Sequence, residues 1–498
     1  MSNLPSKPLG IIGRETEIAL LEKAFNSPSP EFLAIYGRRR IGKTYLISNF
    51  FSRPSATFFQ SIGIRNGKLS DQIKQFTQEL SRTFYSNVEL MPKTNWMDVF
   101  IQLQQAIETC KSEKIVLFLD ELPWMATPKS SLLESLEFYW NRYGSKDPRV
   151  ILIICGSSAS WILENIINNR EGLYNRVTQP IKLSPLTLRE TQNYLNARGF
   201  NYPQKQIMEI YLALGGVPFY LNFLDPKFSV PQNLDSIFFR QTAPLLEEFN
   251  KLFASLFKNS KQHEQLIKLI GNHMYGLELK ELNTHKTISA GGRLSQRLQE
   301  LEDAGFIMKF TPYGFQNKGT FYRVVDPFSL FYLRFVQSFR SNLKKMDQGE
   351  GYWLLLTRSQ HYKSWRGYAF EALCFQHLYP IRKALKIEAD AGIYTWKYKS
   401  TRKEDSGSQV DLIFDRADDV IQLCEIKCTD KPYTITKTYR MNLKNKLETF
   451  KKQAELLSKN ASHKIYFLSF ISAAGLTDNV YSQELVNSAV SLGDLFKV

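Results

Sequence analysis

A short apolar run that leads directly into a glycine-rich loop constrains the fold of this chain most strongly. Residues 32–36 (FLAIY) are followed at once by residues 37–44 (GRRRIGKT) and then by the helix-like stretch 45–51. Strand, glycine-rich loop and helix in this order are the context in which such a loop surrounds phosphate groups. The sequence therefore predicts a parallel sheet that binds a nucleotide at the start of the chain.

Each part of this loop has a chemical role. The glycines let backbone N–H groups curl around a phosphate, Lys43 reaches the β- and γ-phosphate oxygens, and the Thr44 hydroxyl ligates Mg²⁺. We expect ATP or GTP to bind here, with ATP preferred and Mg²⁺ as its partner ion. The predicted nucleotide-binding residues of the loop are Gly37, Arg38, Arg39, Arg40, Ile41, Gly42, Lys43, Thr44 and Tyr45.

Two further buried strands are predicted at residues 115–119 (IVLFL) and 150–155 (VILIIC). The first ends in Asp120 and Glu121, at the edge where parallel sheets bind ligands. We expect Asp120 to hold Mg²⁺ through water and Glu121 to orient and deprotonate the attacking water. The second strand leads to Ser157, whose hydroxyl suits a sensor of the γ-phosphate, with a simple helix cap as the alternative.

Six motifs in order give residues 11–225 a resemblance to a known family. They are residues 13–15 (GRE), the loop GRRRIGKT, the segment LFLDELPW, the strand end CGSS, residues 173–176 (LYNR) and residues 215–218 (GGVP). In these motifs the chain resembles the archaeal-type ATPases of the AAA+/STAND group.

The resemblance implies further nucleotide-site residues. Gly13 and Arg14 would lie near the base, and Pro218, in a helical lid, would help to frame the nucleotide. Arg176 would sense the γ-phosphate or act as an arginine finger. Asn175 stands where the family pattern has glycine, and a solvated surface arginine is the other interpretation of Arg176.

Residues 263–325 have the element order of a winged helix-turn-helix, with helices expected at 263–272, 279–285 and 290–304 and strands at 306–311 and 320–325. Arg293, Gln296 and Arg297 lie early in the third helix, where they could contact phosphates or base edges. The same helix ends in acidic residues that a phosphate backbone would repel. Direct DNA reading and an interdomain or regulatory packing role both stay open, and we favour packing.

The last third contains a predicted β-hairpin with charged side chains. Its strands are residues 409–414 (QVDLIF) and 420–428 (VIQLCEIKC), joined by a turn. Antiparallel pairing places Asp411 directly opposite Glu425, and Lys427 shares the face of Glu425 because it lies two residues further on. Two carboxylates on a hydrophobic hairpin are unfavourable unless something binds there, and Mg²⁺ is the fitting hard cation.

Together with Glu371, in the first turns of a helical stretch at 367–377, this series resembles the PD-(D/E)xK nuclease superfamily over residues ~360–475. It also looks like the C-terminal region often found on archaeal-type ATPases. The resemblance implies that Asp411 and Glu425 ligate Mg²⁺ and that Glu371 completes or orients the metal shell. Lys427 would position the water or steady the developing charge. A fold of this kind that has lost cleavage, or a salt-bridged hairpin, is the alternative.

Three nearby features have plainer interpretations. The triplets at 225–227 and 278–280 repeat the short acidic-x-lysine pattern, but neither follows an aspartate-bearing strand, so we regard them as decoys. Cys424 and Cys428 flank the hairpin site but face the opposite side, as core residues. The basic helix at 444–459 could track a phosphate backbone, although a solvated face is favoured.

Composition restricts the class of protein. The chain has 498 residues, with 64 Lys and Arg against 48 Asp and Glu, a net charge of +16 and no basic tail. Nucleic acid could therefore meet much of the surface. The five cysteines are too few and too scattered for a disulfide framework or a four-ligand zinc site. No apolar stretch approaches the roughly 18 residues that span a bilayer, so we expect a cytoplasmic protein without a membrane partner.

The sequence thus predicts an α/β multidomain protein. The expected domains are a P-loop AAA+-like ATPase core (1–183), a helical lid (184–250), a winged helix (251–326), a helical connector (327–365) and a restriction-endonuclease-like α/β domain (366–498). The expected function is ATP hydrolysis that gates Mg²⁺-dependent cleavage of nucleic acid, with DNA favoured over RNA. A homo-oligomer is left open. The alternatives are a nucleotide-dependent switch that binds nucleic acid or a protein partner without cutting, and a transcription regulator that uses the winged helix.

Overall fold

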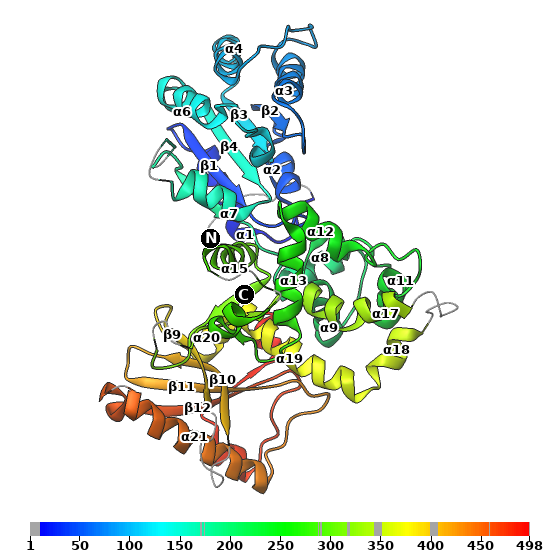
Figure 1. Ribbon diagram of the computed structural model, residues 1–498, viewed down its shortest axis with the longest axis vertical. Coiled ribbons are helices and arrows are strands. Elements are labelled where there is room, and N and C mark those ends of the chain that lie inside the picture. Colours follow the sequence, from blue (N-terminus) through cyan, green and yellow to red (C-terminus); the bar gives the residue numbers. More distant parts are fainter. Residues whose placement is uncertain are drawn as a thin grey trace, which may run out of the picture. The chain divides into compact units, whose positions relative to one another are not determined.

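The computed structural model describes residues 10–169, 172–173, 175–286, 288, 291–315, 319–342, 351–398, 407–457 and 459–497. The chain divides into two compact units, Met1–Pro185 and Leu186–Val498, and Figure 1 shows the elements of each. In the described part of the chain, no helix combines the length and apolar character that crossing a bilayer requires.

The first unit contains a five-stranded parallel sheet in the order β2-β3-β4-β1-β5. Its strands are β1 (Glu31–Tyr36), β2 (Ala56–Ile62), β3 (Lys114–Asp120), β4 (Val150–Gly156) and β5 (Gln179–Lys182). Its helices are α1 (Glu15–Phe25), α2 (Lys43–Phe51), α3 (Leu69–Phe84), α4 (Trp96–Thr109), α5 (Leu122–Met125), α6 (Leu132–Arg142) and α7 (Ala159–Ile162). The predicted parallel sheet is confirmed.

Both faces of this sheet are covered, which explains why its central strands are apolar almost without interruption. Alternate residues of β1, β3 and β4 pack on one face with α3, α4 and α6, and on the other with α1 and α2. Every residue of β4 is buried. The strands therefore end at a common edge, where β1 leads into the glycine-rich loop and β3 into Asp120 and Glu121.

The second unit begins with helices. They are α8 (Leu188–Ala197), α9 (Gln204–Leu214), α10 (Pro218–Leu221), α11 (Val230–Phe238) and α12 (Glu248–Leu256). The turn after α9 requires glycine, because Gly215 and Gly216 have φ values of 65° and 64°. A Cβ on Gly216 would also lie 2.1 Å from the Leu186 carbonyl oxygen.

Three helices and a small antiparallel sheet follow. The helices are α13 (Ser260–Gly271), α14 (Leu279–Thr284) and α15 (Gly292–Asp303), and the strands are β6 (Leu277–Glu278), β7 (Ile307–Phe310) and β8 (Phe321–Val324). The sheet order is β6-β8-β7. The predicted three helices and two strands are present, whereas the two-residue strand β6 was too short to be predicted from side-chain alternation.

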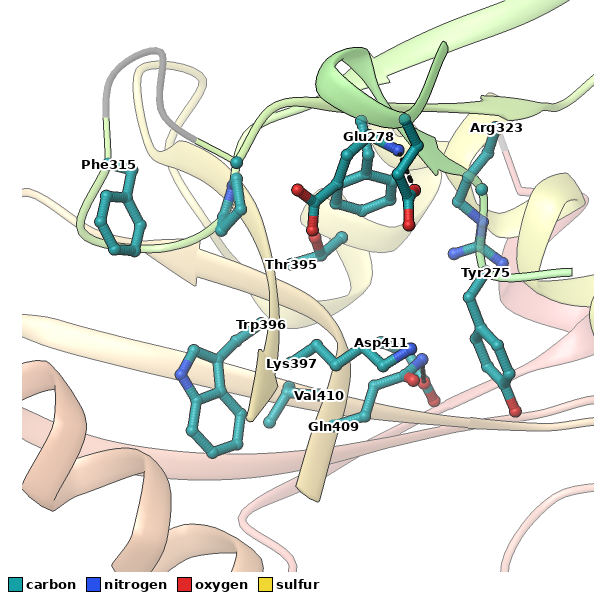
Figure 2. A pocket seen from close by; sticks show the side chains of 15 residues that line it. Tyr275, Glu278, Phe315, Arg323, Thr395, Trp396, Lys397, Gln409, Val410 and Asp411 are labelled. Carbon is teal, nitrogen blue, oxygen red and sulfur yellow. Dashed lines mark hydrogen bonds between the residues drawn. The ribbon is translucent and has the colours of Figure 1, made fainter. Parts of the chain in front are cut away.

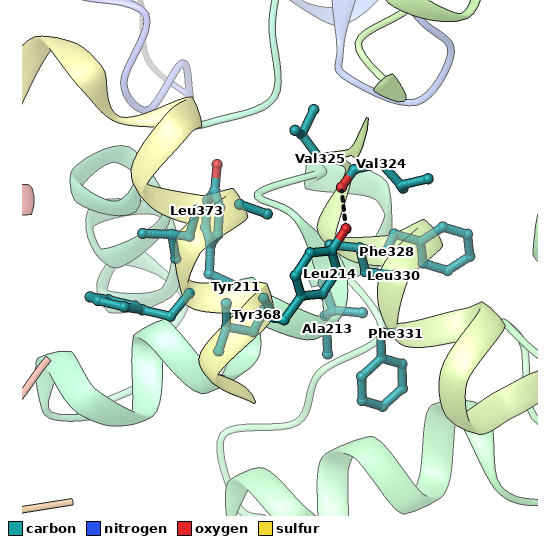
Figure 3. Packing of buried hydrophobic residues seen from close by; sticks show 14 of the residues in the cluster. Tyr211, Ala213, Leu214, Val324, Val325, Phe328, Leu330, Phe331, Tyr368 and Leu373 are labelled. Atoms are coloured by element: carbon teal, nitrogen blue, oxygen red, sulfur yellow. Dashed lines mark hydrogen bonds between the residues drawn. The ribbon is translucent and has the colours of Figure 1, made fainter. Parts of the chain in front are cut away.

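A run of aromatic helices leads to the C-terminal sheet, and Figure 3 shows Phe328, Phe331, Tyr368 and Leu373 in its buried core. It contains α16 (Pro327–Phe331), α17 (Gln337–Asn342), α18 (Tyr352–Thr357), α19 (Gln360–Gln376) and α20 (Leu378–Leu385). The expected helix at 367–377 with Glu371 in its first turns is wrong in extent. The helix begins seven residues earlier, where the Ser359 side chain accepts a hydrogen bond from the Tyr362 N–H and caps it. Glu371 therefore lies in the second half of α19, which also passes through the expected 365–366 domain boundary.

The C-terminal sheet has the order β13-β12-β11-β10-β9. Its strands are β9 (Gly392–Tyr398), β10 (Ser408–Asp415), β11 (Val420–Lys427), β12 (Ile465–Ser472) and β13 (Ser488–Ser491), with helices α21 (Lys437–Leu457), α22 (Val480–Leu485) and α23 (Leu492–Leu495). The β9–β10–β11 pairs are antiparallel, and the β11–β12–β13 pairs are parallel. One face packs against α21 and the other against α19.

The hairpin of β10 and β11 has the predicted register. Leu412 pairs with Cys424 and Asp415 with Ile421, so Asp411 and Glu425 are the next residues across from one another. On its other side β10 has an irregularity against β9, between Val410 and Ile413. A bulge of this kind redirects the side chains beside it, and Asp411 is one of them.

Candidate functional site

The glycine-rich loop is closed around its own lysine. Gly37 has a φ of 147°, and a Cβ there would lie 2.2 Å from the Leu183 carbonyl oxygen, so only glycine fits. Lys43 is buried, and its Nζ donates to the carbonyl oxygens of Gly37 at 2.7 Å and Arg38 at 3.0 Å. The ammonium group thus lies inside the loop, where a phosphate would offer it stronger acceptors.

Thr44 and Asp120 meet as the sequence predicts. The Thr44 hydroxyl donates to Asp120 Oδ2 at 2.6 Å, and Asp120 Oδ1 accepts the N–H of Glu121 at 2.9 Å. Asp120 is buried. Hydroxyl and carboxylate oxygens are the ligands that Mg²⁺ prefers, so this pair fits the magnesium of a bound nucleotide.

The candidate base and the candidate sensor contact one another. Glu121 Oε2 accepts hydrogen bonds from the backbone N–H of Ser157 at 3.1 Å and from its hydroxyl at 2.8 Å. Glu121 has a φ of 50°, a strained value for this residue, in the turn between β3 and α5. This contact was not predicted, because no local pattern links two residues that lie 36 positions apart.

The N-terminal residues of the site lie against the loop. Arg14 is buried and its Nη2 donates to the Ile41 carbonyl oxygen at 3.1 Å. The Tyr45 hydroxyl donates to the Gly10 carbonyl oxygen at 3.0 Å. Gly13 and Arg14 both have positive φ values, 73° and 62°. On the other side of the loop, the Arg39 guanidinium lies 5.1 Å from the ring centroid of Trp124.

Two residues implied by the resemblance stay predictions. Arg176 is exposed and follows Asn175, whose φ of 58° shows that asparagine adopts the left-handed conformation expected of a glycine. Pro218 is the first residue of α10, in the second unit.

A separate cavity in the second unit brings together Glu371, Asp411, Glu425 and Lys427. We call it the carboxylate cavity. It has a volume of about 470 Å³, and its other described lining residues are Tyr275, Gly407, Ser408, Gln409, Asn442, Asn445, Lys446 and Thr449. Most of them come from β10, β11, α19 and α21, whereas Tyr275 precedes β6, so residues up to 174 positions apart contribute to it.

Glu425 is the most enclosed carboxylate of this cavity. Its Oε1 accepts from Lys427 Nζ at 2.7 Å and from the Tyr439 hydroxyl at 2.6 Å, and its Oε2 accepts from Lys446 Nζ at 2.5 Å. Burial acts to raise its pKa, but the two lysines outweigh burial and leave the pKa of Glu425 below its ordinary value. Glu425 therefore stays ionised.

Asp411 is bound less strongly. Its Oδ2 accepts the N–H of Ile426 at 3.2 Å, and its Oδ1 accepts from Gln409 Nε2 at 3.4 Å. Burial, followed by the charges of Glu371 and Glu425, raises the pKa of Asp411 to about 7. The present partners of Asp411 therefore stabilise its charged form only weakly.

Glu371 is paired with an arginine from β8. Arg323 Nη2 donates to Glu371 Oε2 at 2.9 Å. The Arg323 side chain is only 4% exposed and lies near the rings of Tyr368, Phe310 and Phe375. A guanidinium enclosed in this way holds its partner carboxylate firmly in one place.

The donors fit a hard divalent cation, because Glu371, Asp411 and Glu425 all line one cavity and carry the carboxylate oxygens that Mg²⁺ prefers. Within the described residues, however, no three His, Cys, Asp or Glu side chains are already grouped as a metal-ligand set. The ion pairs explain this, since Glu371 turns to Arg323 and Glu425 to its two lysines. Binding of Mg²⁺ would exchange some of these partners for the metal.

Tyr439, Lys446 and Arg323 were not predicted as site residues. Lys446 lies in the helix that we interpreted as a solvated basic face, and for this residue the interpretation is wrong, because its ammonium group bonds to Glu425. Its neighbours Lys451 and Lys452 are exposed. The predicted core role of Cys424 is confirmed, since it is fully buried on the α19 face, where Cys428 also packs.

Comparisons with known proteins bear on the first of the two sites. Residues 11–224 match the family described as an ATPase domain predominantly from Archaea. An uncharacterized protein of Methanocaldococcus jannaschii is 26% identical over 441 residues, which cover 86% of this chain and 90% of the relative.

Two solved structures are similar to most of the chain. A Walker-type ATPase of Pyrococcus abyssi has a TM-score of 0.45 and 18% identity, and the match covers 65% of this chain and 96% of that one. The ORC2 protein of Aeropyrum pernix, solved in ADPNP–ADP complexes, has a TM-score of 0.42 and 14% identity and covers 69% and 97%. On the family match, residues 11–224 are an archaeal-type ATPase domain.

Proposed function

We propose that this chain binds and hydrolyses ATP and that its second unit is a Mg²⁺-dependent nuclease acting on DNA, with the ATPase gating the cut. One observation carries the nuclease part: Glu371, Asp411, Glu425 and Lys427, chosen from the sequence, all line one cavity. The hairpin register that brings Asp411 opposite Glu425 supports it.

In the ATPase site, Lys43 would exchange the loop carbonyls for phosphate oxygens, and Thr44 and Asp120 would hold the Mg²⁺ of the nucleotide. The magnesium ion supplies charge neutralisation at the phosphates. Glu121 orients the attacking water only after its carboxylate turns away from Ser157. The contact between Glu121 and Ser157 is therefore a resting arrangement that hydrolysis must interrupt.

In the carboxylate cavity, Asp411 and Glu425 would hold Mg²⁺, which supplies Lewis-acid stabilisation of the phosphodiester when bound. Lys427 lies within 2.7 Å of Glu425 and would orient the attacking water beside it. Glu371, held in place by its ion pair with Arg323, would complete or orient the metal shell next to Asp411. The helices α13–α15 and the sheet β6-β8-β7 have the order of a winged helix, which we propose packs within the second unit more than it reads DNA.

A nucleotide-dependent switch that binds nucleic acid without cutting is the second candidate. The specific observation in its favour is the full set of ion pairs of Glu425, which compete with a metal ion. With two lysines paired to it, the buried Glu425 carboxylate needs no metal ion to balance its charge.

Incubation of plasmid DNA with the wild type, Lys43→Ala and Asp411→Asn, each with and without ATP and with Mg²⁺ or Mn²⁺, tests the proposal. The matched control is Asp415→Asn, which lies on the same hairpin and pairs with Lys464 instead. Cleavage that requires both Asp411 and Lys43 indicates a gated nuclease, and cleavage that requires only Asp411 an independent one. Binding without any cleavage by the wild type supports the switch.

A further inference from the structure

A second cavity adjoins the carboxylate cavity, and Figure 2 shows it from close by. We call it the side cavity. It has a volume of about 370 Å³ and is lined from the start of α14, the β7–β8 hairpin, β9 and β10. Tyr275, Gln409 and Asp411 line both cavities, so the two adjoin at this edge of β10.

The walls of the side cavity are held together by backbone contacts. The N–H of Tyr313, in the β7–β8 hairpin, donates to the Thr395 carbonyl oxygen of β9 at 2.9 Å. Pro312 and Thr395 form a bridge at the same place. The hollow is thus built from fixed elements of one compact unit.

One wall carries two fixed carboxylates, those of Glu278 and Glu281. The Glu278 N–H donates to Glu281 Oε2 at 2.8 Å, and the Glu278 side chain in turn accepts from the backbone of Glu281, as a reciprocal cap of α14. Each carboxylate oxygen can accept more than one hydrogen bond, so both groups keep acceptor capacity for a ligand. Figure 2 shows Glu278 and Thr395 facing the cavity from different elements.

The wall next to the carboxylate cavity is aromatic and basic. The Tyr275 side chain is 53% exposed, and Lys397 Nζ lies 4.7 Å from the centroid of its ring. An exposed ring of this kind offers a flat surface on which a base can stack, and the lysine beside it favours a phosphate. Figure 2 shows Tyr275 on the same side as Asp411 and Gln409.

These features select for a nucleobase. A phosphate is favoured only on the side of Lys397, away from Glu278 and Glu281, whereas a base with an exocyclic amino group can donate to these two carboxylates. The volume suits one unstacked base and its sugar and excludes a duplex. Because Asp411 lines both cavities, the phosphate next to that base would lie in the carboxylate cavity.

We propose that the side cavity accepts a single unstacked base of the strand whose phosphate lies in the carboxylate cavity, and that it prefers cytosine or adenine to thymine or uracil. Cytosine and adenine present an amino donor where thymine and uracil present a carbonyl oxygen, which two carboxylates repel. That the ligand is a nucleic acid strand rests on the proposed function. Glu278, excluded from the metal site as a decoy, acquires the separate role of base selection.

Binding measured without divalent metal tests this inference independently of cleavage. Fluorescence anisotropy with the full chain compares short single strands of oligodeoxycytidine and oligodeoxyuridine, whose bases differ at C4, an amino group against a carbonyl, and at N3, an acceptor against an N–H donor. We expect oligodeoxycytidine to bind about 10-fold more tightly. Glu278→Gln retains the helix cap and should reduce this preference to under about 3-fold, and Tyr275→Ala should weaken both strands by about 10-fold.

The matched controls are Glu388→Gln and Tyr379→Ala, at exposed positions of the same unit that line neither cavity. Both should bind like the wild type. Equal affinity for the two strands, or a preference that Glu278→Gln leaves unchanged, would overturn the inference.

A free nucleotide carries the same base and phosphate groups as a strand, so it is the other ligand that could occupy the side cavity. Titration of deoxycytidine and deoxyuridine monophosphates into Lys43→Ala distinguishes it, because that variant lacks the lysine of the ATP site. If the mononucleotides reproduce the whole preference while the two strands bind alike, the strand proposal is wrong. Absence of Mg²⁺-dependent cleavage by the wild type would instead count against the nuclease alone, since the binding preference is measured without metal.

Discussion

At the scale of single residues, the ATPase site depends on one cation. Lys43 Nζ is held by two carbonyl oxygens of its own loop, so it is already aimed at the position of the β- and γ-phosphates. Lys43→Ala should reduce ATP affinity by at least about 100-fold, because it removes a charge-assisted bond in a buried place. Binding of a fluorescent ATP analogue measures this, and an unchanged far-ultraviolet circular dichroism spectrum checks the fold. Wild-type hydrolysis by this variant would place the ATPase elsewhere.

Substitution of Glu121, unlike that of Lys43, is expected to spare ATP binding and to block hydrolysis. Glu121→Gln keeps the shape and the hydrogen-bonding capacity toward Ser157 but removes the base. ATP should therefore bind with near-wild-type affinity while turnover falls by about 100- to 10,000-fold. Single-turnover hydrolysis beside equilibrium binding separates the two effects. A loss of binding would contradict the role of Glu121 as a base.

In the second unit, substitution of Lys427 is expected to abolish cleavage without abolishing metal binding. An ammonium group does not ligate Mg²⁺, so Lys427→Ala should lose cleavage by about 100-fold or more while Mn²⁺ still binds. Isothermal titration with Mn²⁺ and a plasmid assay, with exposed Lys431→Ala as the control, measure the two properties. Asp411→Ala or Glu425→Ala should instead lose both the metal and cleavage while DNA binding persists, because removal of a carboxylate reduces repulsion of phosphates.

At the scale of elements, His377 joins α19 to α8. Its Nε2 accepts the N–H of Leu188 at 3.1 Å, and its Nδ1 donates to the Leu373 carbonyl oxygen at 2.9 Å, so the ring is held neutral. Burial lowers the pKa of His377 to about 4. Between about pH 6.5 and pH 4, His377 is protonated in the unfolded chain but not in the folded chain. As the pH is lowered through this range, the free energy of unfolding therefore decreases by at most about 3 kcal/mol because of this group.

His377→Gln removes that titration while it retains an amide donor and acceptor. Chemical denaturation at pH 7 and at pH 4.5 measures the free energy of unfolding of the second unit. The difference between the two pH values should be smaller in the variant than in the wild type. The exposed His273→Gln should leave the difference in place. An identical pH dependence in His377→Gln would contradict the prediction.

The elements also show which parts of the site were predictable. The register of Leu412 with Cys424 follows from alternation and from a short turn, both local properties of the sequence. The contacts of Glu425 with Lys446 and of Glu371 with Arg323 depend on how distant helices and strands pack, and no local pattern distinguishes these two cations from their neighbours. The parallel sheet was predictable because its strands are continuously apolar. The extent of α19 was missed because its N-terminal turns are polar and aromatic in no regular order.

At the scale of the whole molecule, the net charge of +16 is not concentrated in one basic tail. DNA binding should therefore depend steeply on salt and only weakly on any one surface lysine. If about six phosphates are neutralised, affinity should fall by about 1,000-fold between 50 and 200 mM salt. Dissociation constants measured across that range give the slope. A slope corresponding to one or two phosphates would indicate a small local contact and count against DNA as the main partner.

The continuous helix α19 limits how this protein can change over evolution. Its first half packs Tyr362 and Trp365 among aromatic side chains, and its second half carries Glu371. An α-helix turns by about 100° per residue, so one inserted or deleted residue between Trp365 and Glu371 would rotate that carboxylate away from Arg323 and Asp411. Homologues that keep the carboxylate cavity should therefore vary in loop length but keep this spacing constant, and a change of spacing should accompany the loss of Glu371.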